Sequence, residues 1–311
     1  MTKSVDVSVI MPTYNCLEYL PKAVHSVLMQ NVDLELLIID DQSTDGSAQW
    51  LEALQNKDTR IRVIKGEHKG VSAARNLAIA QARGQWLAFL DADDYWYSNK
   101  LKQQLEIHQC DPDVVLSFTD YDHFSEAGSD LGRCFRFWPG FDALLKPEIN
   151  MLNLNGALKT VIYAENVIGT STVLVNKTAV ERVGGFDEHL QSASDWDLWL
   201  KLHHLGNFVA INQPLMGYLV RSNSISRNAE RRLESFELIL ERFREAMTAL
   251  NPSCYPAARA RLKLAQAECW QASEGGYWKA SKAYIQACYQ LPTHRNIRAL
   301  LSHLLKGYKT Q

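Results

Sequence analysis

Residues 85–96 read Gln85-Trp86-Leu87-Ala88-Phe89-Leu90-Asp91-Ala92-Asp93-Asp94-Tyr95-Trp96, an apolar run that ends in three carboxylates. Because this run follows Gly84 and shows no polar side, it predicts a strand covered on both faces of a sheet. The acids then lie at its carboxyl end, which is the edge of an open α/β sheet where ligands bind. Oxygen ligands at this spacing suit Mg²⁺ or Mn²⁺. A solvated acidic turn or a helix N-cap is the simpler alternative.

The composition of the 311-residue chain is that of an ordinary globular protein, with 46% hydrophobic and 22% charged residues. Its length allows one large core, or one domain with an appendage. The formal net charge of -2 gives no general attraction to nucleic acid, so none is expected as a partner. The cysteines are scattered singly, which argues against a disulfide framework or a zinc module.

No secretory signal is recognisable at the beginning of the sequence, and no apolar run approaches the length that spans a bilayer. We therefore expect a cytoplasmic protein. It could also lie peripherally on the inner face of the cell membrane.

Further apolar runs alternate with helical patterns along the chain. Strands are predicted over residues 7–11, 34–39, 61–64, 86–90 and 114–118, and residues 166–175 are predicted to form a loop that enters a strand. Helices are predicted over residues 17–28, 48–54, 70–83, 101–108 and 195–203. This cadence implies right-handed crossovers and an α/β fold with a mostly parallel sheet flanked by helices.

Polar side chains follow the early strands as well. The loop after the first strand reads Pro12-Thr13-Tyr14-Asn15, and the second strand ends in Asp40 and Asp41. The segment from Gly70 to Asn76 opens a helix whose free amides and dipole could receive an anionic group, with a plain capped helix as the alternative. A dinucleotide-binding domain shares this cadence, but its Gly-x-Gly-x-x-Gly fingerprint and the Walker loop are both absent. A metal would therefore have to hold the phosphate.

Taken together, these residues resemble glycosyltransferase family 2, the inverting nucleotide-sugar transferases with a GT-A fold. The matching segments follow the family's order within residues 1–228. They are residues 12–15, 39–41, 70–76, 90–94, 184–187 and 195–199. The resemblance implies a GT-A type, Rossmann-like domain over residues 1–228.

The resemblance also implies a role for each matched residue. Asp195 corresponds to the catalytic base, and Asp93 is the implied ligand of a divalent cation, Mg²⁺ or Mn²⁺, with Asp94 close by. The residues implied to bind the nucleotide are Pro12, Tyr14, Asn15, Asp41, Arg75, Asn76 and Asp91. Inversion needs one carboxylate to take the proton of an acceptor hydroxyl while the metal neutralises the departing diphosphate.

Two positions depart from the family's pattern. Ser194 stands where the family commonly has Glu before the base, and Arg221 stands where it often has His. Arg221 could bind the diphosphate directly, because a guanidinium fork suits phosphate oxygens. We still expect activity to require a divalent ion.

The character of the chain changes to helix over residues 229–311. Paired helices with a closing Leu-Pro resemble a tetratricopeptide unit, and packing against the catalytic domain is the alternative. From Gly275 onward the chain has no acid, while its cations are Lys279, Lys282, Arg295, Arg298, Lys306 and Lys309. We expect this basic end to meet an anionic membrane surface or a protein partner.

The resemblance thus implies a metal-dependent inverting glycosyltransferase of the hexosyltransferase type. It would move a sugar from a nucleoside-diphosphate sugar to a hydroxyl of a glycan or lipid-linked acceptor, in cell-surface polysaccharide synthesis. Ser194 and Arg221 motivate an alternative, a non-catalytic nucleotide-sugar-binding subunit of a glycan assembly complex. The third hypothesis is a nucleotidyltransferase, which would release pyrophosphate.

Overall fold

The computed structural model describes residues 5–146, 148–221, 229–273 and 275–309. The chain divides into two compact units. The first contains residues 1–155, 167–189 and 194–222, and the second contains residues 156–166, 190–193 and 223–311. Two short segments from within the predicted catalytic domain therefore belong to the second unit. The predicted boundary after Asn228 lies outside the described residues.

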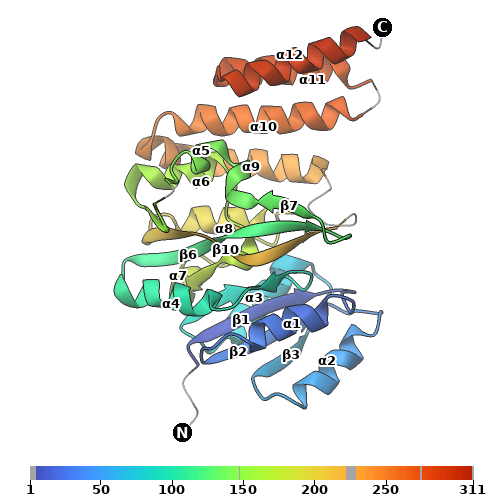
Figure 1. The fold of residues 1–311 in the computed structure, drawn as a ribbon, viewed down its shortest axis with the longest axis vertical. Helices are drawn as coiled ribbons and strands as arrows, with labels where there is room; N and C mark the ends of the chain where they lie inside the picture. Colours follow the sequence, from blue (N-terminus) through green and yellow to red (C-terminus); the bar gives the residue numbers. More distant parts are fainter. Residues whose placement is uncertain (1–4, 147, 222–228, 274, 310–311) are drawn as a thin grey trace. The chain divides into compact units, whose positions relative to one another are not determined.

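The first unit alternates strands and helices from its beginning (Figure 1). Its first half consists of β1 (Val7–Thr13), α1 (Leu20–Leu28), β2 (Leu34–Asp40), α2 (Ser47–Gln55), β3 (Ile61–Lys65), α3 (Val71–Gln81), β4 (Trp86–Phe89), β5 (Tyr95–Trp96) and α4 (Lys100–Cys110). Its second half consists of β6 (Val114–Ser125), β7 (Asp130–Arg133), η1 (Cys134–Phe137), α5 (Pro139–Asp142), β8 (Met151–Leu154), η3 (Thr170–Thr172), β9 (Leu174–Asn176), α7 (Lys177–Arg182), α8 (Ser194–Leu202) and β10 (Asn207–Val220).

The strands form one sheet, which has ten strands within the described residues. Eight of them follow the order β3-β2-β1-β4-β9-β6-β10-β5, while β7 pairs with β6 and β8 pairs with β10. Strands β3, β2, β1 and β4 are parallel, and β6 runs parallel to β10. The short strand β9 is antiparallel to both β4 and β6, and β5, β7 and β8 pair antiparallel at the margins. The predicted α/β fold with a central sheet flanked by helices is confirmed, although the sheet is mixed beyond its first four strands.

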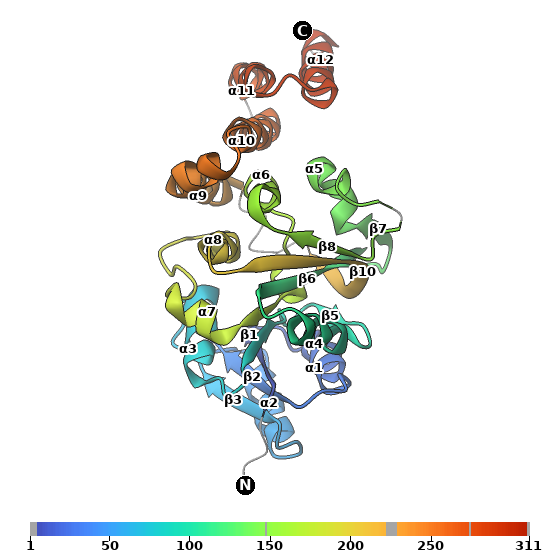
Figure 2. The same ribbon diagram turned by 90° about the vertical axis from the view of Figure 1, so that its left-hand side faces the viewer.

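Helices cover both faces of the parallel strands. Figure 2 shows α1 and α4 on one side of β1 and β2, and α3 and α7 on the other. Helix α1 buries Leu20, Ala23, Val24 and Val27, whose spacing places them on one stripe facing the sheet. All seven residues of β2 are buried, as expected for a strand covered on both faces.

The second unit is helical. It consists of η2 (Gly156–Thr160), α6 (Val161–Ala164), α9 (Ala229–Leu250), α10 (Cys254–Gln271), α11 (Tyr277–Gln290) and α12 (His294–Lys309). The hydroxyl of Tyr163 donates to the carbonyl of Leu240 at 2.6 Å, and Arg261 pairs with Glu165 at 3.2 Å, which ties residues 156–166 to α9 and α10. The likeness of these helices to a tetratricopeptide unit stays a prediction.

Among the described helices, none combines the length and the apolar character that crossing a membrane requires.

Candidate functional site

The carboxyl ends of β1, β2 and β4 meet at one edge of the sheet. In the parallel register β4 ends with Phe89 opposite Ile10, and β1 and β2 continue to the pair of Thr13 and Asp40, so all three strands end toward the same edge. Hydrogen bonds connect the loops that follow β1 and β2. The amide of Asp41 donates to the carbonyl of Thr13 at 2.9 Å. This edge therefore collects the polar side chains that the sequence places after each strand.

The residues predicted to meet the nucleotide base lie at the β1 and β2 end of this edge. The amide of His68 donates to Asp41 Oδ1 at 2.7 Å, and the ring of the half-exposed Tyr14 lies 5.2 Å from that of His68. A cavity of about 200 Å³ opens beside Asp41 and the first turns of α3. Pro12 is less accessible, because it pairs with Ile39 inside the sheet.

The loop after β1 is held by the loop after β2. The amide of Asn15 donates to Ser43 Oγ at 2.9 Å, and the Asn15 side-chain oxygen accepts from the amide of Thr44 at 2.7 Å. Asn15 adopts a left-handed conformation, with φ of 51°, which asparagine tolerates better than most residues. Its side chain thus shapes the wall of the predicted base site by fixing two loops together.

Arg75 and Asn76 stand next to each other on α3 but have different partners. The buried Arg75 donates through Nη2 to Asp91 Oδ1 at 2.5 Å, and its guanidinium lies 5.3 Å from the ring of Phe186. Asn76 uses its amide nitrogen on the carbonyl of Phe186 and on Glu188, at 2.9 and 2.8 Å. The structure therefore brings Arg75 to the acids and turns Asn76 to the segment that follows Gly185.

Asp93 faces a cation that comes from the far end of β10. Arg221 Nε lies 3.0 Å from Asp93 Oδ2, and its guanidinium stacks over Tyr19 at 5.1 Å. Arg221 Nη1 also lies 3.9 Å from the thiol sulfur of Cys16. Burial raises the pKa of Asp93, and the nearby Asp91 raises it further, while Arg221 acts in the opposite direction. Arg221 thus partly offsets the cost of placing two carboxylates together.

Asp94 is turned into the protein. It is buried, and its two oxygens accept hydrogen bonds from Ser171 Oγ at 2.6 Å and from the amide of Leu219 at 3.3 Å. Burial raises the pKa of Asp94 well above its usual range, and the charges of Asp93 and Asp91 act in the same direction. Of the two adjacent acids predicted to hold the metal, Asp93 is the more accessible.

Asp195 lies at the first turn of α8. Its Oδ2 accepts a hydrogen bond from Thr170 Oγ1 at 2.6 Å, and its Oδ1 accepts one from the amide of Trp196 at 2.8 Å. The preceding Ser194 is buried and accepts a hydrogen bond from the hydroxyl of Ser72 at 2.8 Å. At the position where the family commonly has Glu, this chain therefore has a hydroxyl that ties α8 to α3.

The segment η3 joins the two groups of acids. Thr170 bonds to Asp195, and its neighbour Ser171 bonds to Asp94 and accepts from the amide of Asp91 at 3.1 Å. Residues 166–172 were predicted only as a loop entering a strand, so the site contacts of Thr170 and Ser171 were missed. Their hydroxyl side chains were the signal in the sequence, but their partners lie about 25 to 80 residues away along the chain.

The fit of a divalent cation depends on Asp91 and Asp93. Their side chains are 35% and 23% exposed, and their oxygens are hard ligands of the kind that Mg²⁺ and Mn²⁺ prefer. No group of three or more His, Cys, Asp or Glu side chains in the described part of the chain is placed to hold a metal alone. The residues present therefore fit an ion whose remaining ligands are water and the oxygens of a diphosphate.

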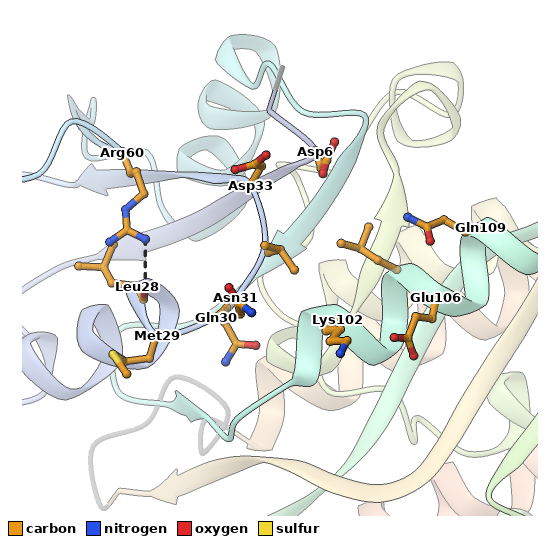
Figure 3. Close-up of a pocket in the computed structure, with 12 residues that line it drawn as sticks. Asp6, Leu28, Met29, Gln30, Asn31, Asp33, Arg60, Lys102, Glu106 and Gln109 are labelled. Carbon is orange, nitrogen blue, oxygen red and sulfur yellow. Dashed lines mark hydrogen bonds between the residues drawn. The ribbon is translucent and has the colours of Figure 1, made fainter. Parts of the chain in front are cut away.

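A separate cavity of about 810 Å³ lies at the opposite edge of the sheet (Figure 3). It is lined by residues that precede β1 and β2, such as Asp6 and Asp33, by the end of α1, and by one side of α4. Arg60 crosses its wall and donates to the carbonyl of Leu28 at 3.2 Å. None of the residues predicted for the site lines it.

Several solved structures share the fold, among them those of TarS and PcManGT. The structure of S. aureus TarS 1-349 in complex with UDP-GlcNAc superposes with a TM-score of 0.62 at 18% identity, covering 99% of this chain and 93% of that chain. The mannosyltransferase PcManGT from Pyrobaculum calidifontis, in complex with GDP-Man and Mn²⁺, gives a TM-score of 0.61 at 17% identity, covering 98% and 87%. At this identity the likeness concerns the fold alone, and it confirms the predicted GT-A type arrangement.

Sequence relatives are more informative about the family. Residues 8–153 match the profile of Glycosyl transferase family 2. The putative teichuronic acid biosynthesis glycosyltransferase TuaG of Bacillus subtilis is 36% identical over 227 residues, which cover 71% of this chain and 82% of TuaG. The Escherichia coli UDP-Glc:alpha-D-GlcNAc-diphosphoundecaprenol beta-1,3-glucosyltransferase WfaP is 32% identical over 226 residues, covering 71% and 80%. The predicted resemblance is thereby confirmed, and the chain is a glycosyltransferase that belongs to glycosyl transferase family 2.

Proposed function

We propose that the protein transfers a sugar, with inversion, from a nucleoside-diphosphate sugar to a hydroxyl of a glycan or lipid-linked acceptor. One observation carries the proposal. The segment η3 bonds through Thr170 to Asp195, the proposed base, and through Ser171 to Asp94, beside the acids proposed to meet the diphosphate. Consecutive residues thus hold the proposed base and an acid next to those proposed to meet the diphosphate.

The proposed donor is a uridine diphosphate sugar. WfaP carries UDP-Glc in its name, and the TarS structure holds UDP-GlcNAc. The base would lie against Tyr14 and Asp41, and Asp41 also lines the cavity of about 200 Å³. A thermal-shift screen of nucleoside diphosphates with Mn²⁺ tests the choice of base, because stabilisation grows with ligand concentration over Kd.

The diphosphate would lie over the strand-end acids and their arginines. We assign Asp93 as a ligand of the divalent ion, next to Asp94, whose side chain is bonded to Ser171 and to the amide of Leu219. The Mn²⁺ in the PcManGT complex supports this choice of ion. When bound, Mg²⁺ or Mn²⁺ supplies positive charge that neutralises the leaving diphosphate. Arg221 would turn from Asp93 toward the phosphate oxygens, since a guanidinium can bind two of them at once.

Asp195 would act as the base. It accepts the proton of the acceptor hydroxyl as that oxygen forms a bond to the anomeric carbon, while the bond from that carbon to the diphosphate oxygen breaks. The hydrogen bond from Thr170 holds Oδ2 in place, so the carboxylate is positioned before the acceptor arrives. The hydroxyl of Ser194, bonded to Ser72, takes no part in this transfer and fixes the start of α8.

The proposed product belongs to the cell surface. TuaG is named for teichuronic acid biosynthesis, and WfaP for a sugar carried on diphosphoundecaprenol. Both relatives align along most of their length, which supports an acceptor of the same class for this chain. We therefore propose a role in cell-surface polysaccharide synthesis.

The substitution Asp195→Asn tests the chemistry. We expect transfer to fall by about 10³-fold, while the affinity for UDP changes less than about twofold, because the amide keeps the shape of the side chain but cannot take a proton. Asp130→Asn in β7, which removes an exposed carboxylate elsewhere in the first unit, is the matched control. Sugar transfer and the released nucleotide are measured together, and UDP binding is measured by calorimetry.

Each outcome of this experiment has a distinct meaning. Near-normal transfer by the Asn variant removes Asp195 from the role of base. Release of pyrophosphate by the wild-type protein points to a nucleotidyltransferase, and UDP-sugar binding without turnover points to a non-catalytic subunit. Full transfer in excess EDTA contradicts the metal requirement.

A further inference from the structure

The last helix of the second unit, α12, has one face that packs within the unit and another face that is exposed. One face packs on the preceding helices, where His303 is buried, bonds to Ser281 at 2.9 Å and stacks on Tyr277 with ring centroids 4.6 Å apart. Asn296, which lies two helical turns before His303 on the same face, is buried and donates to the carbonyl of Leu291 at 2.8 Å. The helix is therefore already docked within its unit through this side.

The other face of α12 is apolar and exposed. It consists of Ile297, Leu301, Leu304 and Leu305, which recur at i, i+4, i+7 and i+8 and so form one stripe, here called the α12 stripe. Leu301 and Leu305 are 54% and 67% exposed. Because α12 is held by its other face, packing within the unit does not explain a second row of large aliphatic side chains.

Exposed cations border the α12 stripe and none of its neighbours in sequence is acidic. Arg298 is adjacent to Leu305 on the helical wheel, with Arg295 one turn earlier, and both side chains are exposed. On α11, Lys279 and Lys282 are also exposed. From Gly275 onward the sequence contains no Asp or Glu. The α12 stripe therefore suits a partner that is apolar and negatively charged together.

Helix α11 repeats the arrangement. Its exposed large side chains are Trp278, Ile285 and Tyr289, at i, i+7 and i+11, and Trp278 and Tyr289 are 76% and 87% exposed. Trp and Tyr prefer the boundary between headgroups and acyl chains, because one part of the ring system is apolar and the other forms hydrogen bonds. An amphipathic helix with aliphatic and aromatic residues beside Lys and Arg is typical of segments that lie in the plane of a membrane.

We propose that the α12 stripe and its bordering cations dock the protein on an anionic lipid surface. The stripe inserts its aliphatic side chains at the headgroup boundary, and the cations of α11 and α12 meet lipid phosphates. This commits the basic end of the chain to lipid rather than to an acidic protein. The inference is independent of the proposed sugar transfer, since its test reads binding alone.

The test compares sedimentation of the full chain with vesicles of phosphatidylglycerol and of phosphatidylcholine. Wild-type protein is expected to sediment with phosphatidylglycerol vesicles and to bind phosphatidylcholine at least about tenfold more weakly. Raising the salt concentration from 0.1 to 0.5 M is expected to weaken the binding further, because the lipid surface potential is screened.

Two variants separate the apolar and charged contributions. Leu301→Ser with Leu305→Ser removes most of the exposed stripe, and its matched control is Leu238→Ser, an exposed leucine on α9. Arg295→Gln with Arg298→Gln removes the two cations that border the α12 stripe, and its control is Lys57→Gln with Lys102→Gln in the first unit. Each test variant should lose about tenfold in affinity for anionic vesicles, and each control less than twofold.

Circular dichroism and the thermal midpoint of unfolding check that the variants fold. Because the charge variant keeps all apolar packing, it still tests the proposal if the leucine variant is unstable. Equal binding by wild-type protein and the charge variant overturns the proposal. A second result would also overturn it. If the wild-type protein does not bind vesicles and the leucine variant has a lower mass by light scattering than the wild type, the α12 stripe mediates contacts between copies of this chain instead.

Discussion

The carboxyl edge and the amino edge of the parallel strands differ in how their charged side chains are arranged. At the carboxyl edge, Asp91 and Asp93 are each met by an arginine, and the Arg75 of the first pair is almost completely buried. At the amino edge, Asp6 and Asp33 line a cavity of about 810 Å³, and none of the residues predicted for the site lines it. We therefore do not place the proposed site by the volume of a cavity. Crowded carboxylates whose charges the fold has to compensate mark it better.

The same comparison applies to the strand ends themselves. The carboxyl edge collects side chains from β4, β10, η3 and α8, so its geometry requires several distant segments at once. The amino edge is built from short connections, such as the one from α1 to β2. We expect substitutions at the carboxyl edge to change activity and those at the amino edge to change stability.

The largest effect is expected from Asp93→Asn compared with Asp6→Asn. Removing the carboxylate from the proposed diphosphate end should lower kcat/KM for transfer by about 10³-fold, because the charge of the leaving group loses its compensation. Asp6→Asn should leave kcat/KM within twofold. Mn²⁺ affinity, followed by calorimetry, should weaken only in the first variant. Comparable losses in both variants would erase the distinction between the edges.

A pH effect on stability is expected at the amino edge. His108, near the end of α4, is buried, bonds to the carbonyl of Val114 at 3.1 Å and to Ser117 at 2.9 Å, and burial lowers its pKa to about 4. The unfolded chain, with a pKa near 6.5, then binds the proton first as the pH falls. Stability is complete above about pH 6.5 and decreases toward pH 4, by up to about 3 kcal/mol.

The substitution His108→Gln isolates this contribution, since glutamine can still donate and accept hydrogen bonds. Urea unfolding of both proteins at pH 7 and pH 4.5 should give a smaller loss of unfolding free energy for the variant. Transfer at pH 7 should stay near the wild-type rate. An identical pH dependence in the two proteins would mean that His108 is not the group responsible.

The hydroxyl of Thr170 should have an intermediate effect. Thr170→Val removes the donor to Asp195 and keeps the shape, so we expect kcat to fall by about 10- to 100-fold, as for a hydrogen bond to a charged group. The KM for the donor should change little, because Thr170 contacts Asp195, the proposed base, rather than the loops proposed to bind the nucleotide. Thr170→Ser, which restores a hydroxyl, should recover most of kcat. A loss that the serine variant does not recover would indicate packing instead.

The smallest effect is expected from Arg60→Ala. Arg60 pairs with Asp58 at 2.8 Å and caps the carbonyl of Leu28 at the rim of the large cavity, but it is substantially exposed. We expect the variant to lose about 1 kcal/mol of unfolding free energy and no activity. A thermal scan and a transfer assay measure the two. A clear loss of transfer would give this cavity a role in the reaction.

Much of the fold was readable from the sequence. The runs ending at Asp40 and at Asp91 were assigned as strands because buried parallel strands show no polar side, and both are strands in the structure. Strand β10 was missed. Pro214 and Gly217 interrupt its pattern, and the ladder with β6 shifts register at both. A Cβ at Gly217 would lie 2.4 Å from the ring of Tyr95, so the glycine allows β5 to pair there.

The sequence by itself determined the order of the first four strands and their helices, and the family, because apolar periodicity and ordered short motifs are local properties of the chain. It also placed Asp91, Asp93 and Asp94 together at a strand end. Only the tertiary structure distinguished among them. Their partners are Arg75, Ser171, Leu219 and Arg221, which folding brings in from separate elements. Whether a carboxylate faces solvent or the interior depends on those partners, since a buried charge needs donors that no neighbouring residue in the sequence supplies.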